Sequence, residues 1–259
     1  MFFLSRPNRW SVYISESLES LYVTIKFESK TFKLLSNTGL LLYRSKTFHD
    51  KEPDTNDWIK TIPNDGVFFD VGANVGVFTI LASTFCRKVL AFEPVAINYS
   101  VLNQNIMINR LDDVATAYCL AISDKSHFDT MRLSSNVVGS AHHTFGKNID
   151  ACHEEFSPVF KQGAFAASLD DLVYKYGFEC PTYLKVDVDG NENLVMAGAH
   201  ELLKDQRLRS ILIELNVSLE IDKGLIDQIK SQNFELSARG NEAFMSNGMK
   251  VENLIFFRK

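Results

Sequence analysis

The pattern of apolar and polar positions changes near residue 67, and from there on two kinds of segment alternate along the chain. One kind is a short, continuous apolar run, which is typical of a strand buried on both faces of a parallel sheet. The other is a longer segment with one apolar face, which predicts a helix. The predicted strands cover 67–72, 89–92, 115–122, 183–188 and 211–215, and the predicted helices cover 75–85, 97–108, 192–203 and 225–232.

Strands that alternate with helices favour right-handed βαβ units and a mostly parallel sheet, so residues 61–259 predict one α/β domain. The sequence SLDD at 168–171 resembles a capping box and predicts a further helix that ends at Tyr176. At the end of the chain, Ala243–Ser246 and Val251–Phe257 predict a hairpin around Asn247-Gly248.

Residues 1–60 follow a less regular pattern and predict a small, β-rich N-terminal extension. Leu21–Phe27 and Thr31–Leu35 are predicted as short strands joined by a turn at Glu28–Lys30. Asn37–Gly39 predicts another turn before the sequence LLLYRS, and a short helix is expected around Trp58.

A segment at about 125–165 interrupts the alternation within the main domain. It contains the sequence HFDTMRL, then a polar stretch, then an expected helix near Ala151–Phe156. We interpret the segment as an insertion near the carboxyl ends of the strands. Long insertions at this place are often functional lids, and a disordered segment is the alternative.

Composition and charge exclude several classes of protein. With 46% hydrophobic and 23% charged residues among 259, the chain is neither disordered nor of low complexity. The net charge of −5 argues against a nucleic-acid binder with a globally basic surface. Residues 1–51, however, carry eight Lys or Arg and only four Asp or Glu. This excess is either a basic rim for an anionic substrate or, as we favour, an ordinary solvated surface.

The cysteines and the apolar runs bear on the compartment. The four cysteines lie far apart without a CxxC pair, which predicts reduced thiols rather than a zinc site or a disulfide framework. The sequence shows no apolar run that resembles a signal peptide or a membrane span. We therefore expect a cytoplasmic protein.

The turn DVGANVG at 70–76, after the first predicted strand, is the main candidate for a ligand site, because ligands of open α/β sheets bind beyond the carboxyl ends of the strands. Its glycines allow a tight turn, but their spacing is not the GxGxxG that cradles a pyrophosphate. After the second strand, Glu93 can accept hydrogen bonds from both hydroxyls of a ribose. Asp70 would repel a phosphate and suit a cation, so the two strand ends favour a positively charged nucleoside such as S-adenosylmethionine.

Six motifs, in this order, resemble the FkbM family of S-adenosylmethionine-dependent methyltransferases: FDVGANVG at 69–76, AFEP at 91–94, AISD at 121–124, SLDD at 168–171, KVDVDGNE at 185–192 and IELN at 213–216. The segment KEPDTNDW at 51–58 also resembles the region before the domain in part of the family. The resemblance implies a class I methyltransferase fold. This is a Rossmann-like, seven-stranded, mostly parallel sheet with helices on both faces and one antiparallel strand. It also implies O-methylation, typically of a sugar, glycan or natural product.

Seven residues are expected to bind the cofactor. They are Asp70, Gly72, Ala73, Asn74, Gly76, Glu93 and Asp124. The first five form the turn at the methionine end, and Glu93 binds the ribose. The resemblance places the adenine at the loop 121–124, with Asp124 as a candidate contact. For Asp70, the alternative is a cap of the following helix.

Lys185, Asp187 and Glu214 are the expected catalytic residues. Lys185, Asp187 and Asp189 alternate along the fourth predicted strand, so we expect their side chains on one face. Charges inside a buried run are costly unless they are paired. Lys185 and Asp187 are therefore either a structural ion pair or part of the active site, with Asp187 as a base or metal ligand. Members of the family usually carry Glu at position 189, so a shorter acid stands here.

The sequence leaves open whether the protein binds a divalent metal such as Mg²⁺. Asp187, Glu214 and Asn216 would make an oxygen-rich set that suits it, by analogy with catechol-type O-methyltransferases. The alternative is that these residues hold the acceptor or a loop by hydrogen bonds. Glu192 and the insertion residues His142 and His143 are further candidates for a general base, and the alternative for the histidines is a solvated loop.

The leading hypothesis is an S-adenosylmethionine-dependent O-methyltransferase that acts on a sugar or glycan. A lipid, polyketide or other small-metabolite hydroxyl is the first alternative acceptor, and an inactive cofactor-binding module in a glycan-assembly complex is the second alternative function. The missing GxGxxG disfavours a dehydrogenase, and the sequence DVDG at 187–190 lacks the Pro-Pro-aromatic motif of base-modifying methyltransferases. We expect a small-molecule or glycan partner and no nucleic acid, and the oligomeric state is open.

Overall fold

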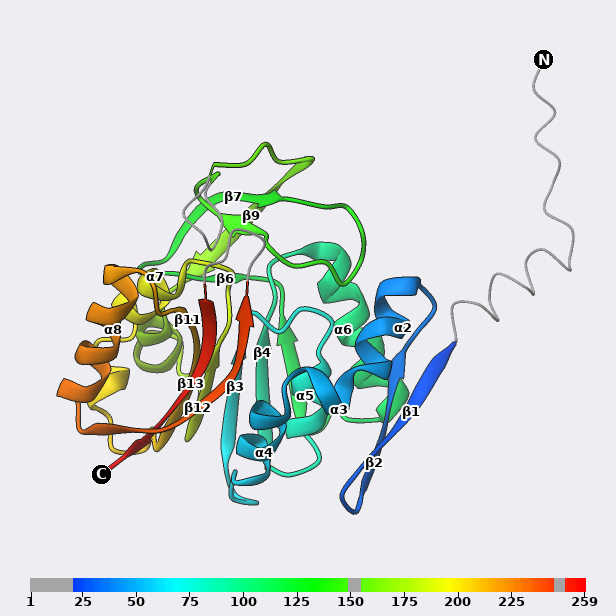
Figure 1. Ribbon diagram of the computed structural model, residues 1–259, viewed down its shortest axis with the longest axis horizontal. Helices are drawn as coiled ribbons and strands as arrows, with labels where there is room; N and C mark the ends of the chain where they lie inside the picture. Colours follow the sequence, from blue (N-terminus) through cyan, green and yellow to red (C-terminus); the bar gives the residue numbers. More distant parts are fainter. Residues whose placement is uncertain (1–20, 149–154, 245–249) are drawn as a thin grey trace, which may run out of the picture.

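The computed structural model describes residues 21–148, 155–244 and 250–259, and its centre is a seven-stranded sheet (Figure 1). The strand order is β12-β13-β11-β10-β3-β4-β5. β13 runs antiparallel to both of its neighbours, and the other neighbouring pairs are parallel. The bounds are β3 Val67–Val71, β4 Lys88–Phe92, β5 Ala115–Tyr118, β10 Tyr183–Val186, β11 Ser210–Asn216, β12 Phe234–Phe244 and β13 Lys250–Arg258. The predicted seven-stranded sheet with one antiparallel strand is confirmed.

Helices cover both faces of this sheet, because alternate residues of each buried strand point to opposite sides. Phe68 contributes to the core under α4 (Pro53–Lys60), α5 (Val77–Ala82) and α6 (Ala96–Asn109). Its neighbour Phe69 contributes to the core under α7 (Glu192–Ala197) and α8 (Glu220–Ser231). Both phenylalanines are fully buried, so the strand has no solvent-facing side and needs no polar alternation.

The N-terminal extension contains the predicted hairpin, β1 (Tyr22–Phe27) and β2 (Lys30–Leu35), but it also contains three helices. α2 (Gly39–Lys46) occupies the sequence LLLYRS, for which only a preceding turn was predicted, and α3 (Phe48–Lys51) follows it. The Thr38 side chain caps α2 by accepting a hydrogen bond from the backbone N–H of Leu41. The β-rich expectation is therefore wrong for residues 39–51, and the helix expected around Trp58 is confirmed as α4. Because Trp58 of α4 packs on Phe68, the extension shares a core with the sheet, and a domain boundary near residue 60 stays a prediction.

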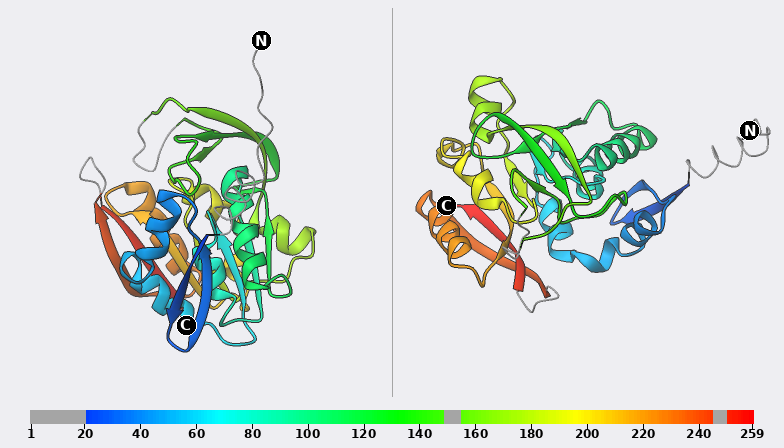
Figure 2. Two further views of the ribbon diagram at one scale, coloured as in Figure 1. Left: turned by 90° about the vertical axis from the view of Figure 1, so that its right-hand side faces the viewer. Right: turned by 90° about the horizontal axis from the view of Figure 1, so that it is seen from above.

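The insertion forms a second sheet, of order β6-β9-β7-β8, which lies over the edge of the main sheet in all three views (Figures 1 and 2). Its strands are β6 Ala121–Ile122, β7 His127–Leu133, β8 Thr144–Phe145 and β9 Phe160–Ala167. The prediction of one strand over 115–122 is wrong, because the chain leaves the main sheet after Tyr118 and β6 pairs with β9. The expected helix near residues 151–156 lies mostly outside the described residues.

Other elements differ from their predictions at the ends. The segment after Ser168 is a short π-helix, Asp171–Lys175, and the Ser168 hydroxyl accepts the backbone N–H of Asp171, as the capping box predicts. The predicted helix over 192–203 is divided into α7 and a 3₁₀ turn at Leu202–Lys204. β12 begins at Phe234, nine residues before the predicted strand. In the part of the chain that the structure describes, no helix is both long and apolar enough to cross a membrane.

Candidate functional site

A pocket opens at the carboxyl ends of β3, β4 and β10, at the edge of the sheet that the insertion covers. Its volume is about 550 Å³, solvent at its mouth included. The main sheet and its loops contribute Val71, Gly72, Asn74, Phe92, Glu93, Pro94, Val95, Asn98, Leu120, Asp187, Val188, Asp189 and Asn191, and the second sheet and its loops contribute Ala121, Ile122, Met131, His143 and Phe145. The insertion therefore provides one wall of the pocket.

The turn after β3 is held against the ends of both neighbouring strands. The backbone N–H groups of Gly72 and Ala73 both donate to the carbonyl of Phe92, at 3.0 Å. Gly72 has a φ of +81°, and a Cβ atom there would lie 1.7 Å from the carbonyl oxygen of Asp187. Glycine is thus required by the close approach of β10 as well as by the backbone conformation. Gly76 has a φ of +84°, and a Cβ atom there would lie 2.3 Å from a side-chain methyl group of Leu102.

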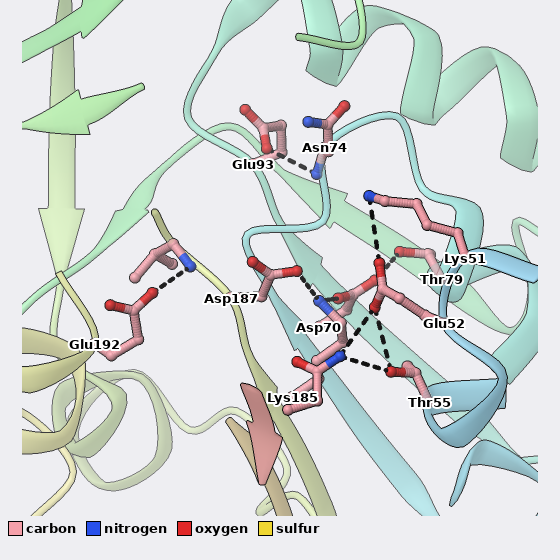
Figure 3. Close-up of polar contacts among 12 residues, drawn as sticks. Lys51, Glu52, Thr55, Asp70, Asn74, Thr79, Glu93, Lys185, Asp187 and Glu192 are labelled. Atoms are coloured by element: carbon pink, nitrogen blue, oxygen red, sulfur yellow. Dashed lines mark hydrogen bonds and ion pairs between the residues drawn. The ribbon is translucent and has the colours of Figure 1, made fainter. Parts of the chain in front are cut away.

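Glu93 lines the pocket, is 4% exposed and braces the turn. One carboxylate oxygen accepts from the backbone N–H of Asn74 and the other from that of Val95, both at 2.8 Å (Figure 3). Burial raises the pKa of Glu93 to about 8, against these two hydrogen bonds. Each oxygen keeps a second lone pair, so the carboxylate can still accept hydrogen bonds from a ribose.

Asp70 and Lys185 lie beneath the pocket instead of lining it. They are paired in register on β3 and β10, and both are 1% exposed. Asp70 accepts a 2.6 Å hydrogen bond from Thr79 of α5, and the Lys185 ammonium lies 3.9 Å from its other oxygen. Lys185 also donates to Asp187 at 2.8 Å (Figure 3). A direct role of Asp70 in cofactor binding stays a prediction, and the geometry favours the alternative in which it binds the helix that follows.

The charges of Asp70, Lys185 and Asp187 shift one another's pKa values. Burial raises the pKa of Asp70, opposed by Lys185 and Thr79. Burial alone would lower the pKa of Lys185, but the charges of Asp187, Asp70 and Glu52 raise it above its usual value. Burial would raise the pKa of Asp187, but Lys185 holds it below its usual value. Asp187 is therefore an ionised group at the pocket wall.

The loop after β10 is ordered by Glu192, which is the first residue of α7 and is 6% exposed. Its carboxylate accepts from the backbone N–H groups of Val188 and Gly190, at 3.0 Å. Asp189 has a φ of +57°, so the expected alternation with Lys185 and Asp187 ends at Val186. Its side chain turns to the insertion and accepts from the backbone N–H of His142, at 2.8 Å. The expectation that all three side chains share one face is wrong for Asp189.

Titration of Glu192 gives a testable dependence of stability on pH. Burial raises its folded-state pKa from 4.5 to about 8 against the hydrogen bonds of the loop, and Glu93 behaves similarly. At a pH between the unfolded-state pKa of 4.5 and the folded-state pKa of about 8, the folded state binds more protons than the unfolded state. The contribution of Glu192 to stability is therefore fully present at low pH and is lost as the pH rises. We expect the free energy of unfolding to fall between pH 5 and pH 8, by up to about 1.4 kcal/mol per pH unit for each group. Urea titrations of the wild type and of Glu192→Gln check this, with a shallower slope expected for the variant. A wild-type stability that is flat over this range would contradict it.

Loop residues 139–142 of the insertion lie next to the pocket residue His143 and are held by hydrogen bonds from several elements. The carbonyl of Ser140 accepts from the side chain of Asn74 at 2.9 Å and from that of Asn98 at 3.3 Å. The backbone N–H of Gly139 donates to Asn98 at 2.7 Å, and the carbonyl of Gly139 accepts from Arg44 of α2 at 2.8 Å. We call residues 139–142 the strap. It connects the N-terminal extension to the turn that carries Asn74.

His143 lines the pocket, but both of its ring nitrogens are engaged. Burial lowers its pKa to about 4, so the ring is neutral at pH 7. Nδ1 accepts from the backbone N–H of Ser134 at 3.2 Å, which leaves the proton on Nε2, 3.0 Å from the Ser140 hydroxyl. His143 therefore has no lone pair left for a general base. His142 is exposed, with Nδ1 3.6 Å from Asp189.

Asp124, Glu214 and Asn216, like Asp70, Ala73, Gly76 and Lys185, are not among the residues that line the pocket. Asp124 is exposed, and its side chain accepts a hydrogen bond from the hydroxyl of Ser123. Glu214 is half-buried next to the loop after β10, where burial and the charges of Asp187 and Asp189 raise its pKa well above the usual value. The side chain of Asn216 accepts the backbone N–H of Ser218. Roles of Asp124 and Glu214 stay predictions.

The donors proposed for Mg²⁺ do not converge. Asp187 is paired with Lys185, and Asn216 turns to its own loop. Within residues 21–148, 155–244 and 250–259, no three His, Cys, Asp or Glu side chains gather as a metal site would require. The structure therefore does not support the magnesium site.

Sequence reasoning missed several wall residues. Asn98 is 1% exposed on α6, and a buried amide in an otherwise apolar helix face was the available signal. Met131 and Phe145 come from the insertion, whose path the sequence did not predict.

The residues that line the pocket suit S-adenosylmethionine chemically. The described lining holds three acidic side chains, Glu93, Asp187 and Asp189, of which Asp187 is kept ionised by Lys185 and suits a ligand with a net positive charge. Ile122, Met131 and Phe145 form an apolar end that suits a flat aromatic base. The residues present are thus compatible with this cofactor.

Comparison with known proteins decides the family. The sequence profile of the Methyltransferase FkbM domain matches residues 70–236, more than half of the chain. The chain belongs to the FkbM methyltransferase family. The matched region of this FkbM chain begins at Asp70, after the extension with α2, α3 and α4.

Individual relatives of this FkbM chain are distant. Methyltransferase sdnD of Sordaria araneosa is 27% identical over 165 residues, which are 55% of this chain and 64% of sdnD. The tRNA m1G37 methyltransferase of M. jannaschii has a TM-score of 0.50 at 12% identity, over 92% of this chain and 55% of that one. The FkbM methyltransferase of Methylobacillus flagellatus KT has a TM-score of 0.48 at 13% identity, over 84% and 53%.

This FkbM chain therefore spans less than two thirds of the length of each of these relatives. The similarity to the M. jannaschii enzyme shows a shared fold alone. Because that protein is named for tRNA, the expectation that the present chain binds no nucleic acid stays a prediction.

Proposed function

We propose that this chain is an S-adenosylmethionine-dependent O-methyltransferase whose acceptor is a hydroxyl of a sugar or glycan. The observation that carries the proposal is the pocket between the Gly72–Asn74 turn and Glu93, with the ionised Asp187 at its wall. Family membership supports methyl transfer, and the carboxylates of the wall support a cationic cofactor.

The residues divide the chemistry between binding and orientation. Bound S-adenosylmethionine supplies an activated methyl group on a sulfonium. Glu93 accepts hydrogen bonds from the ribose and fixes the backbone of Asn74. Asp187, held by Lys185, accepts a hydrogen bond from the acceptor hydroxyl and aims its oxygen lone pair. The hydroxyl proton passes to a carboxylate of the wall, Asp187 or Asp189.

A lipid, polyketide or other small-metabolite hydroxyl is the alternative acceptor. The apolar end of the pocket, with Met131 and Phe145, is the feature that favours it, if that end holds acceptor instead of adenine. An inactive cofactor-binding module is a further alternative, and the paired Lys185 and Asp187 speak against it. A cytoplasmic location stays part of the proposal.

Calorimetric titration tests the proposed cofactor. We expect the wild type to bind S-adenosylhomocysteine and not NAD. We expect Glu93→Ala to weaken this binding by about 10–100-fold, because the acceptor of two ribose hydrogen bonds is lost together with the hydrogen bond that holds the backbone of Asn74. Glu201→Ala is the matched control, since Glu201 is an exposed glutamate whose pairing with Lys204 lies on a surface turn. Binding of NAD, or of neither ligand, would refute the proposal.

Acceptor screening then separates the classes. Nucleotide sugars and free glycans are assayed beside hydroxylated lipids and polyketides, with mass spectrometry of the product. A methyl ether on a sugar oxygen supports the leading acceptor class, and turnover confined to the other compounds contradicts it.

A further inference from the structure

The pocket has no positive side chain of its own. Among its described lining residues, the acidic side chains are Glu93, Asp187 and Asp189, and there is no lysine or arginine. The methionyl end of S-adenosylmethionine carries a carboxylate as well as an ammonium. Carboxylates in proteins are bound by charge-assisted hydrogen bonds, most strongly from arginine. A pocket wall of three acids leaves that carboxylate in need of a cation.

Lys185, the buried cation beneath the pocket, is already paired with carboxylates of this chain. The ammonium of Lys185 lies 2.8 Å from Asp187 and 3.9 Å from Asp70, and its side chain is 2% exposed. His143 is neutral at pH 7, because burial lowers its pKa to about 4. A cation for the cofactor must therefore come from an element that does not itself line the pocket.

Arg44 of α2 is connected to the pocket wall through the strap. Its Nε donates to the carbonyl of Gly139, and the next residue of the strap, Ser140, is bound by the wall residues Asn74 and Asn98. Arg44 forms no ion pair with any carboxylate among the described residues, although its positive charge acts on Asp187 and Asp189. The hydrogen bond to Gly139 uses only Nε, and the strap places Arg44 one residue away from the contacts of Ser140 with Asn74 and Asn98.

Lys51, at the end of α3, is the second cation on this side. It is 53% exposed and lies 3.5 Å from Glu52, so it is held only by a surface pair. Figure 3 shows its ammonium on the side of the Asn74 turn, beyond Glu52. Its charge, like that of Arg44, acts on Asp187. Both cations belong to the N-terminal extension, outside the region that matches the family profile.

We propose that Arg44, assisted by Lys51, forms a carboxylate-binding site at the mouth of the pocket that holds the carboxylate of the cofactor's methionyl group. The inference rests on the proposed function, and it gives the N-terminal extension a part in cofactor binding. A carboxylate on the acceptor has the same chemistry, so the experiment must separate the two sources.

Two adenosine ligands make that separation. S-Adenosylhomocysteine carries the amino-acid end, whereas 5′-methylthioadenosine has the adenosine and the sulfur without it. Calorimetry measures both dissociation constants for the wild type, Arg44→Gln and Lys51→Gln. Glutamine at position 44 keeps an N–H donor for the carbonyl of Gly139 while it removes the charge. Lys46→Gln, an exposed lysine on the same helix, is the matched control.

For S-adenosylhomocysteine we expect a weakening of about 10-fold or more in Arg44→Gln and about 2–5-fold in Lys51→Gln, since the second cation is more exposed. For 5′-methylthioadenosine we expect no change in either variant, and Lys46→Gln should leave both ligands unaffected. A thermal melt of each variant verifies that the fold is intact.

Each other outcome overturns the inference in a recognisable way. Equal weakening of both ligands in Arg44→Gln would mean that Arg44 only supports the strap. Unchanged affinities for both ligands would exclude the cofactor's carboxylate and leave the acceptor as the source of the anion. A wild type that binds neither ligand would refute the proposed function itself, which is a different result from a wild type that binds both and variants that do not discriminate.

Discussion

Gly72→Ala is expected to destabilise the protein by about 2–5 kcal/mol and to abolish binding of S-adenosylhomocysteine. The added Cβ would lie 1.7 Å from the carbonyl oxygen of Asp187 and 2.8 Å from its carbonyl carbon, so β3 or β10 must move. Overpacking of this kind costs about 1–3 kcal/mol. The φ of +81° adds about 1–2 kcal/mol for any residue with a side chain. Gly72 and Asp187 lie on the two sides of this contact and both line the pocket, so the movement also displaces the groups expected to bind the cofactor.

Gly177→Ala separates the two contributions. Gly177 has a φ of +74°, but a Cβ atom there would meet nothing within 4 Å. This variant should lose only the conformational part, about 1–2 kcal/mol, and should bind S-adenosylhomocysteine normally. Urea unfolding and calorimetry of both variants measure the difference. If Gly72→Ala lost no more stability than Gly177→Ala and kept its affinity, the close approach of β10 would not be needed for the site.

The strands of the main sheet were predictable because they are buried on both faces. Runs such as VFFDV need no register or partner to be recognised, and the acidic residue or glycine that follows marks the edge where ligands bind. For the same reason the turn 70–76 and Glu93 were found together from their places at two strand ends. In the structure the carboxylate of Glu93 accepts a hydrogen bond from the backbone N–H of Asn74, 19 positions earlier in the sequence, a contact that the sequence did not predict.

Side-chain direction at the strand ends was harder to predict. Asp70 is on β3, but strand alternation turns it to the α5 face, where Thr79 binds it. Asp189 was expected beside Lys185, yet the strand ends at Val186 and a positive φ reorients the loop. In each case the decisive information is a backbone angle or a partner from another element, which spacing alone does not contain.

Elements that depend on distant partners were also missed or misplaced. Residues 115–122 are apolar except for Thr116, so their pattern does not show that the chain changes sheets after Tyr118. β12 is an edge strand with two register irregularities and a polar sequence, FELSARGNEAF, which has neither an apolar run nor clean alternation. The sequence did not reveal the hydrogen bond of Arg44, because its partner Gly139 lies 95 residues away in an insertion whose path was not predicted.

Lys185→Met is expected to cost about 3–5 kcal/mol of stability at pH 8, because removal of one partner leaves a buried charge uncompensated. Methionine matches the length of the lysine stem, so the loss reports the charge more than the packing. Asp70, at 1% exposure, keeps only the hydrogen bond from Thr79. The double variant Lys185→Met with Asp70→Asn removes the two fully buried charges and should recover the part of the loss that Asp70 causes, while Asp187, 27% exposed, stays partly hydrated without its partner.

The dependence of this loss on pH distinguishes charge from packing. Without Lys185, burial raises the folded-state pKa of Asp70 still further above its unfolded value, so the variant is stable while Asp70 is protonated and loses stability as the pH rises. Urea unfolding should therefore show a small difference from the wild type near pH 4 and the full difference at pH 8. Lys204→Met is the control, since Lys204 pairs with Glu201 on the surface and should change stability by less than about 1 kcal/mol. A loss for Lys185→Met that is equal at both pH values and persists in the double variant would show that the lysine stem, and not its charge, stabilises the junction of β3 and β10.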